Sequence, residues 1–113
     1  MTIDIKNTIN LEDFRTQGAK LFTGRDRGKI VRENSKIDEI ENNFDEVNII
    51  IPDNIYAINP SFFEEFFTNV VNKLGRERFL NKFKFENHSD YNYEKSLNEA
   101  IDRLLRRKTA LDR

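Results

Sequence analysis

Short runs in which apolar positions are continuous, or alternate with polar ones, mark the strand-forming parts of the chain. Residues 47–51 form a compact apolar run, rich in β-branched side chains and ended by Pro52, which predicts a buried central strand. In residues 79–86 phenylalanines alternate with charged residues, which predicts a strand with one face in water. Weaker patterns predict short strands over residues 2–9 and 20–22.

Two stretches have apolar residues at helical spacing, one between the predicted strands 20–22 and 47–51 and one after residues 79–86. The first is expected to begin at Thr23, because threonine followed three residues later by Asp26 fits a capping box, and to break near residues 34–35. The second covers residues 97–105 and is followed by arginines and a lysine, which suit the negative end of a helix dipole.

The strongest helical pattern follows a turn and a short apolar segment at residues 55–58. Asn59 and Pro60 are the residue types of an N-cap and a first helical position, and Gly75 is a natural stop. Between them a stripe at helical spacing predicts a core-facing helix, formed by Phe63, Phe66, Phe67, Val70, Val71 and Leu74. Phe62 lies at the margin of this stripe, so we expect it to be exposed and available to a partner or a second copy.

Strands that alternate with helices predict an α/β fold with right-handed crossovers between parallel neighbours. The 113 residues suffice for a single domain over 1–113. We expect a small mixed sheet of about four strands with helices packed on one face. The N-terminal strand and loop, residues 1–18, either join this sheet or pack elsewhere.

Composition narrows the chemistry that the chain can perform. Cysteine is absent and His88 is the only histidine, so disulfides, thiolate metal sites and multi-histidine zinc sites are excluded. The common nucleophilic triads are missing, because there is no Cys/His pair and no Gly-x-Ser-x-Gly turn. We therefore expect a protein that is not an enzyme and that carries no metal or other cofactor.

Charge and hydropathy bear on partners and location. The net charge is −1, with 19 basic and 20 acidic residues, and this balance does not favour a nucleic-acid partner. The basic tail, residues 103–113, is interpreted as a solvated helix end, with nucleic-acid binding as the weaker alternative. Residues 1–10 lack a signal-peptide core, and no apolar run approaches the roughly 20 residues that span a bilayer. We expect a cytoplasmic protein without membrane contact. The sequence does not determine its oligomeric state.

The start of the first predicted helix is a candidate anion site. A helix N-terminus presents free amide groups and the positive end of a dipole, and cationic side chains add to both here. The candidate residues are Thr23, Gly24, Arg25, Arg27, Gly28 and Lys29. The segment is not a phosphate-binding P-loop, because only three residues separate its glycines and Ile30 follows the lysine. The alternative is that the arginines are solvated or pair with Asp26 and Glu33.

Ser61 is the second chemical candidate, because it occupies the second position of the predicted phenylalanine-rich helix. A serine there is commonly no more than a local cap. It is also a phosphorylation candidate, since phosphate would add roughly −1.5 to −2 charges at a helix start, where the dipole tolerates them.

Three segments together resemble the STAS-like domain of unknown function, a relative of bacterial anti-sigma-factor antagonists. They are Phe-Thr-Gly-Arg-Asp-Arg-Gly at 22–28, Val-Asn-Ile-Ile-Ile at 47–51 and Ile-Asn-Pro-Ser-Phe-Phe-Glu-Glu-Phe-Phe at 58–67. The resemblance implies a small mixed sheet backed by helices. In the antagonists the corresponding turn carries Asp-Ser-Ser-Gly, whose second serine is phosphorylated by a partner kinase. That serine falls on Ser61, while Asn59, Pro60 and Phe62 stand at the other three positions.

The leading functional hypothesis is a non-enzymatic, regulatory protein-interaction module switched at or near Ser61. The resemblance implies an ATPase or kinase of the anti-sigma or histidine-kinase type as the partner. The expected contact residues are Asn59, Pro60, Ser61, Phe62, Glu64 and Glu65. The alternative is a domain that senses a nucleotide or phosphate with the Thr23–Lys29 loop.

Overall fold

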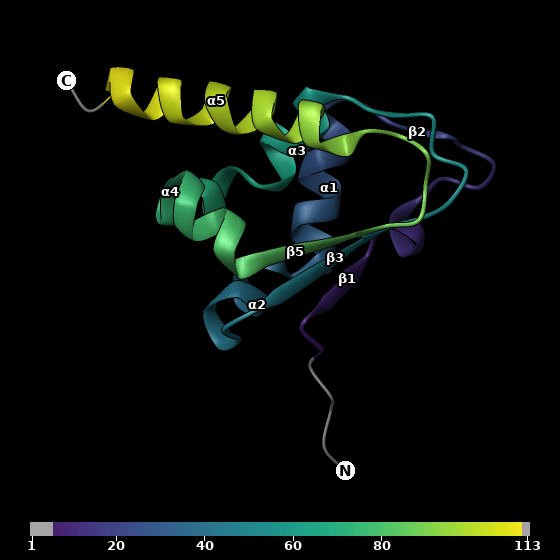
Figure 1. Cartoon of the computed structure of the whole chain (residues 1–113), viewed down its shortest axis with the longest axis horizontal. Helices are drawn as coiled ribbons and strands as arrows, with labels where there is room; N and C mark the ends of the chain where they lie inside the picture. Colours follow the sequence, from purple (N-terminus) through teal and green to yellow (C-terminus); the bar gives the residue numbers. More distant parts are fainter. Residues whose placement is uncertain (1–5, 112–113) are drawn as a thin grey trace, which may run out of the picture.

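The computed structural model describes residues 6–111, with side chains for residues 6–109, and has an α/β fold (Figure 1). Its strands form two small parallel sheets, one with the order β1-β3-β5 and one with the order β2-β4. The strands are β1 (Thr8–Asn10), β2 (Leu21–Phe22), β3 (Val47–Ile51), β4 (Ala57–Ile58) and β5 (Phe83–Asn87). A short 3₁₀ helix, Leu11–Phe14, follows β1.

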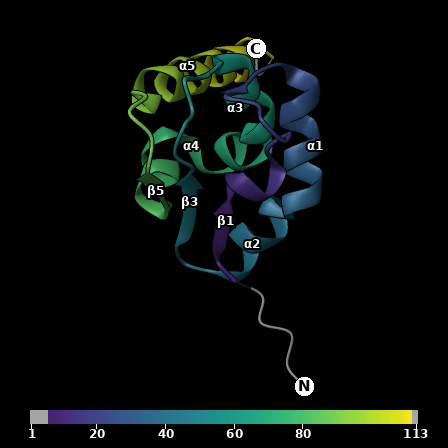
Figure 2. The same cartoon turned by 90° about the vertical axis from the view of Figure 1, so that its right-hand side faces the viewer.

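Residues 6–111 contain five α-helices. They are α1 (Arg25–Ser35), α2 (Ile37–Asn43), α3 (Pro60–Phe66), α4 (Thr68–Lys82) and α5 (Tyr93–Leu111). Figures 1 and 2 show α3 and α4 between the sheet and α5, with α1 along the side of α3. In β3, residues 47, 49 and 51 are buried against the helices, whereas 48 and 50 on the opposite face are partly exposed. This alternation is that of a strand with one buried face and one partly exposed face.

The expected single mixed sheet is wrong in two respects. All strands among residues 6–111 pair in parallel, and they divide into two sheets instead of one. The division follows from the turn after β3, because Pro52 cannot donate a ladder hydrogen bond and Asn54 turns the chain with a positive φ of 59°. The next strand, β4, pairs with β2 and does not join the three-stranded sheet. β1 pairs with β3, so residues 8–10 of the N-terminal segment do join the main sheet.

Several predicted element boundaries are confirmed. The first helix breaks at residues 35–36, where Lys36 has a left-handed conformation with φ 62°. Asn59 caps α3, with Pro60 as its first residue. Gly75 has a positive φ of 79°, but helical structure resumes after it, so α4 is kinked there and continues to Lys82. Residues 79–82 are consequently helical and not part of a strand.

Two expectations about local structure fail. The N-cap of α1 is Gly24 and not Thr23, and no side chain caps this helix, so the predicted capping box does not form. Phe62 is fully buried, although we expected it to be exposed. Its ring packs 5.1 Å from that of Phe22. The reason is that α3 lies between α1 and α5, so phenylalanines on more than one side of this helix face the core.

Candidate functional site

The structure places the two regions that the sequence singled out side by side. The backbone N–H of Asn59, just after β4, donates a hydrogen bond of 2.9 Å to the carbonyl oxygen of Phe22, the last residue of β2. The ends of β2 and β4 therefore lie at the same corner of the molecule. α1 begins just after β2 and α3 just after β4. The Thr23–Lys29 loop and the Asn59–Glu65 segment form one composite region.

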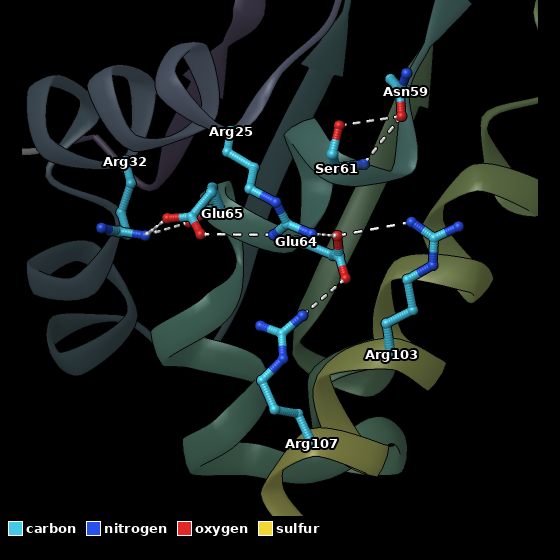
Figure 3. A network of polar contacts seen from close by, with 8 residues as sticks. All are labelled: Arg25, Arg32, Asn59, Ser61, Glu64, Glu65, Arg103 and Arg107. Atoms are coloured by element: carbon cyan, nitrogen blue, oxygen red, sulfur yellow. Dashed lines mark hydrogen bonds and ion pairs between the residues drawn. The ribbon is translucent and has the colours of Figure 1, made fainter.

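Asn59 organises the start of α3. Its side-chain Oδ1 accepts hydrogen bonds from both the backbone N–H and the hydroxyl of Ser61, each at 3.1 Å (Figure 3). Ser61 is half-buried and Asn59 is exposed, so the hydroxyl lies at the surface of the corner and not in the core. This geometry leaves open both interpretations of Ser61, as a local cap and as a modification site.

Two of the six predicted partner-contact residues are not available to a partner. Phe62 and Glu64 are buried, whereas Asn59, Pro60, Ser61 and Glu65 are exposed or half-buried. Phe62 belongs to the core. Glu64 belongs to the interior for a different reason, because charged side chains of the protein itself surround its carboxylate.

Three arginines from two helices converge on the Glu64 carboxylate (Figure 3). Arg25, the first residue of α1, places Nη2 3.1 Å from Oε2. From α5, Arg103 Nη1 lies 3.7 Å from the same oxygen, and Arg107 Nη2 donates to Oε1 at 3.4 Å. We call Glu64 with these three arginines the arginine cluster. It links α3 to α1 and to α5.

The contacts in the arginine cluster are loose for a buried carboxylate. Among the described residues, Oε2 of Glu64 accepts no hydrogen bond of good geometry, although two guanidinium groups lie near it. The Glu64 side chain is fully buried, while about half of each arginine side chain is exposed. Each guanidinium has five N–H donors, so most of the donors in the cluster remain available to solvent or to a ligand.

Glu65 forms a neighbouring, tighter link between α3 and α1. Arg32 donates to both its backbone carbonyl oxygen and its side-chain Oε1, the latter at 3.2 Å. Arg25 Nη1 lies 3.9 Å from the other carboxylate oxygen. Glu65 is thus a structural contact of α1, with 27% of its side chain exposed.

A surface hollow of about 680 Å³ lies at the start of α1. Its lining includes Thr23, Gly24, Arg25 and Arg27 of the predicted anion loop, together with the apolar side chains of Leu21 and Ile30. Arg27 Nη2 donates a 2.7 Å hydrogen bond to the hydroxyl of Thr16, so this guanidinium is held at the edge of the hollow. Four of the six predicted anion-site residues therefore do share one concave surface.

Gly28 and Lys29 do not fit the predicted anion site. Gly28 is buried, and its N–H already donates to the carbonyl of Gly24 at 3.2 Å. A Cβ at this position would lie 2.5 Å from the backbone oxygen of Phe62, so the glycine is needed for the close approach of α1 to α3. Lys29 is exposed and does not line the hollow.

Glu41 is a second buried glutamate. Glu41 of α2 accepts hydrogen bonds from Lys73 at 2.7 Å and Lys82 at 2.8 Å, one on each carboxylate oxygen. The Lys82 ammonium also donates to the Glu41 backbone carbonyl at 2.7 Å. Burial of the Glu41 carboxyl acts to raise its pKa, but the hydrogen bonds from the two lysines outweigh it, so the pKa lies below the ordinary value.

Sequence reasoning missed both buried glutamates as charge centres. The signal for Glu64 is its place among four buried phenylalanines, which puts a charged residue on a helix that mostly faces the core. The signal for Arg103 and Arg107 is their i, i+4 spacing on an amphipathic helix. We interpreted that tail as solvated, but two of its arginines contact Glu64 instead.

Among residues 6–111 no group of three or more acidic or histidine side chains is placed to hold a metal ion, and no helix is both long and apolar enough to span a membrane. No protein-family model, no curated protein and no solved structure matches the sequence.

Proposed function

We propose that the chain is a non-enzymatic protein-interaction module, regulatory in the manner that the STAS resemblance implies. Its contact surface would be the side of the molecule where β2, β4 and the start of α1 meet the Asn59–Ser61 corner. We call this surface the docking face and define it by Leu21, Ile30, Tyr56, Asn59 and Ser61.

The observation that carries the proposal is the gathering of exposed apolar side chains on the docking face. Among the described residues four large apolar side chains are exposed: Leu21 (51%), Ile30 (46%), Tyr56 (66%) and Leu80 (38%). Leu21 and Ile30 line the same hollow. Tyr56 lies beside Lys20, the residue before Leu21, with the Lys20 ammonium 4.9 Å from the Tyr56 ring centre. Exposed apolar groups gathered in this way, with tyrosine among them, are typical of protein interfaces.

Ser61 offers a means of regulation at the edge of the docking face. Among the described residues, its hydroxyl forms a hydrogen bond only with Asn59 Oδ1, an exposed neighbour, so a kinase could reach it without opening the core. Phosphorylation would add roughly −1.5 to −2 charges and would end this hydrogen bond. In the proposed function, the added charge would change how tightly an ATPase or kinase partner binds to the neighbouring apolar residues.

Affinity capture from the native cells tests this proposal. Immobilised wild-type protein should retain a specific partner that Leu21→Asn and Tyr56→Ala variants lose, because both substitutions remove exposed apolar contact area. Leu80→Asn is the matched control, since Leu80 is exposed away from the docking face. Equal capture by all variants, or no specific partner for the wild type, would contradict the proposal. Ser61→Asp should change the amount captured if Ser61 is the switch.

The second candidate function is sensing of a nucleotide or phosphate by the hollow at the start of α1. The observation that favours it is the shared lining by Thr23, Gly24, Arg25 and Arg27. Calorimetry with ATP, GTP and cyclic nucleotides should then show heat that Arg27→Ala abolishes. Heat that is absent, or unchanged by Arg27→Ala, removes this candidate.

A further inference from the structure

We propose that the arginine cluster binds a dianionic phosphoryl group through Arg25, Arg103 and Arg107. Arg25 also lines the hollow at the start of α1, but the site differs from that hollow because its other two arginines come from α5. The ligand class is a phosphate monoester or inorganic phosphate.

The first argument is convergence. Arg25 and Arg103 both place a guanidinium nitrogen within 4 Å of one oxygen of Glu64, and Arg107 places one near the other oxygen. The three planar groups are therefore neighbours, although they come from α1 and from two successive turns of α5. Figure 3 shows them reaching the carboxylate from different sides. Glu64 thus holds them together before any ligand arrives, which lowers the entropy cost of binding.

The second argument is excess charge. Within the cluster three arginines face one glutamate. Including the adjoining ion pairs of Glu65 with Arg32 and of Arg103 with Glu99, four arginines still face only three glutamates. The three cluster arginines are 46–51% exposed, so their surplus charge is directed to the surface and not into the core.

The third argument is the weakness of the internal contacts. Oε2 of Glu64 accepts no hydrogen bond of good geometry among the described residues, and Arg107 donates to Oε1 at a long 3.4 Å. Glu64 therefore uses few of the guanidinium donors, and the others are available to a second anion. A phosphoryl dianion has more charge and more acceptor oxygens than the carboxylate beneath it, and the forked donors of arginine match it in a bidentate manner.

Titration of the ¹⁵N-labelled full chain with inorganic phosphate tests the site. At pH 7.5 and constant ionic strength, the backbone amides around residues 25, 103 and 107 should shift with saturation, whereas chloride should leave them unchanged. The Arg103→Gln/Arg107→Gln double variant should weaken binding by about tenfold or more, because two charge-assisted contacts are lost. Arg27→Gln and Arg106→Gln are the matched controls, since these arginines lie outside the cluster, and each should bind as the wild type does.

Further probes identify where the phosphoryl group would come from. Phenyl phosphate stands for a free monoester, a phosphoserine peptide for a modified protein, and vesicles containing phosphatidic acid for a lipid headgroup. The probe that binds most tightly, with the same dependence on Arg103 and Arg107, names the source.

The proposal is overturned by shifts that do not saturate, or by equal weakening in Arg106→Gln, which would indicate a diffuse basic surface. Weakening in Arg27→Gln alone would place the anion in the hollow. If the double variant is unfolded by circular dichroism, the single Arg107→Lys variant decides, because it keeps the charge but loses the bidentate fork. It should weaken phosphate binding while remaining folded, and unchanged binding counts against the site. None of these outcomes depends on the docking face, whose test uses Leu21 and Tyr56.

Discussion

Glu41 and Glu64 are both buried glutamates on helices and both are surrounded by cations, but their surroundings differ. Glu41 receives one lysine at 2.7–2.8 Å on each oxygen. Glu64 has three arginines at 3.1–3.7 Å, and Oε2 accepts no hydrogen bond of good geometry among the described residues. More cations therefore do not mean a better satisfied carboxylate.

The Glu41 site and the arginine cluster also differ in how far their cationic side chains are exposed. The Lys82 side chain is only 21% exposed, so its charge and that of Glu41 depend on each other. The arginines around Glu64 can each exchange with water or with another anion. We infer that the Glu41 site locks α2 to α4, whereas the arginine cluster joins α1, α3 and α5 and keeps its donors available.

The largest expected effect comes from breaking the Glu41 site. Glu41→Gln has nearly the same shape but removes the charge, which leaves the ammonium of Lys82 largely buried without a counter-charge. We expect the free energy of unfolding to fall by about 3 kcal/mol, at the lower end for a broken buried ion pair because Lys73 can turn to solvent. Urea denaturation at pH 7 measures this. Glu39→Gln on the same helix is the exposed control and should change stability little. A loss below about 1 kcal/mol would mean that the lysines are rehydrated and that the site is no lock.

The next largest effect concerns the approach of α1 to α3, on which the arginine cluster depends. Gly28→Ala would place a Cβ 2.5 Å from the Phe62 backbone oxygen and 2.7 Å from Glu65 Cβ. The helices must separate, and we expect a loss of about 2 kcal/mol from overpacking. Because Arg25 is on α1, phosphate binding at the cluster should weaken as well, while the Glu41 site stays intact. A Gly28→Ala protein that is as stable as the wild type would show that the two helices can shift apart freely.

The sequence predicted the elements around these sites better than the sites themselves. The Asn59 cap, the break near residue 35 and the buried strand at 47–51 all follow from local rules of capping, helix termination and strand composition. The burial of Phe62 and the role of Gly28 do not, because both depend on which helix packs against α3. Local patterns cannot specify that neighbour.

The same limit explains the charged sites. Glu64 and Glu65 are adjacent in the sequence and have the same charge, yet one is buried and the other is partly exposed. Only the positions of α1 and α5 on the two sides of α3 distinguish them. The α5 arginines lie some 40 residues from Glu64 in the sequence, so no spacing rule connects them.

Acidification should remove part of the Glu41 contribution. The pKa of Glu41 is lowered in the folded protein from an ordinary value of 4.5. The stability that its charge provides is therefore fully present above about pH 4.5, and it is lost as the pH falls through the lower folded value. The difference in the free energy of unfolding between wild type and Glu41→Gln should therefore decrease as the pH falls below about 4.5. The decrease should be only part of the roughly 3 kcal/mol expected at pH 7. Glu12, whose pKa the hydrogen bond from Arg15 also lowers, is common to both proteins and cancels. A difference that is constant from pH 7 to pH 3 would contradict the ionised Glu41 site.

The smallest expected effect is that of Glu64→Gln, and it completes the comparison because the substitution is chemically identical to Glu41→Gln. The arginines that lose their counter-charge are about half exposed, so water can solvate them, and the oxygen without a hydrogen bond has little to lose. We expect a loss of about 1 kcal/mol, well below that of Glu41→Gln, in the same urea denaturation. Glu39→Gln, at an exposed position, again controls for the loss of one negative charge. A loss equal to that of Glu41→Gln would show that Glu64 is itself the lock between α1, α3 and α5. The half-exposed arginines would then be committed to the fold and not available to an anion.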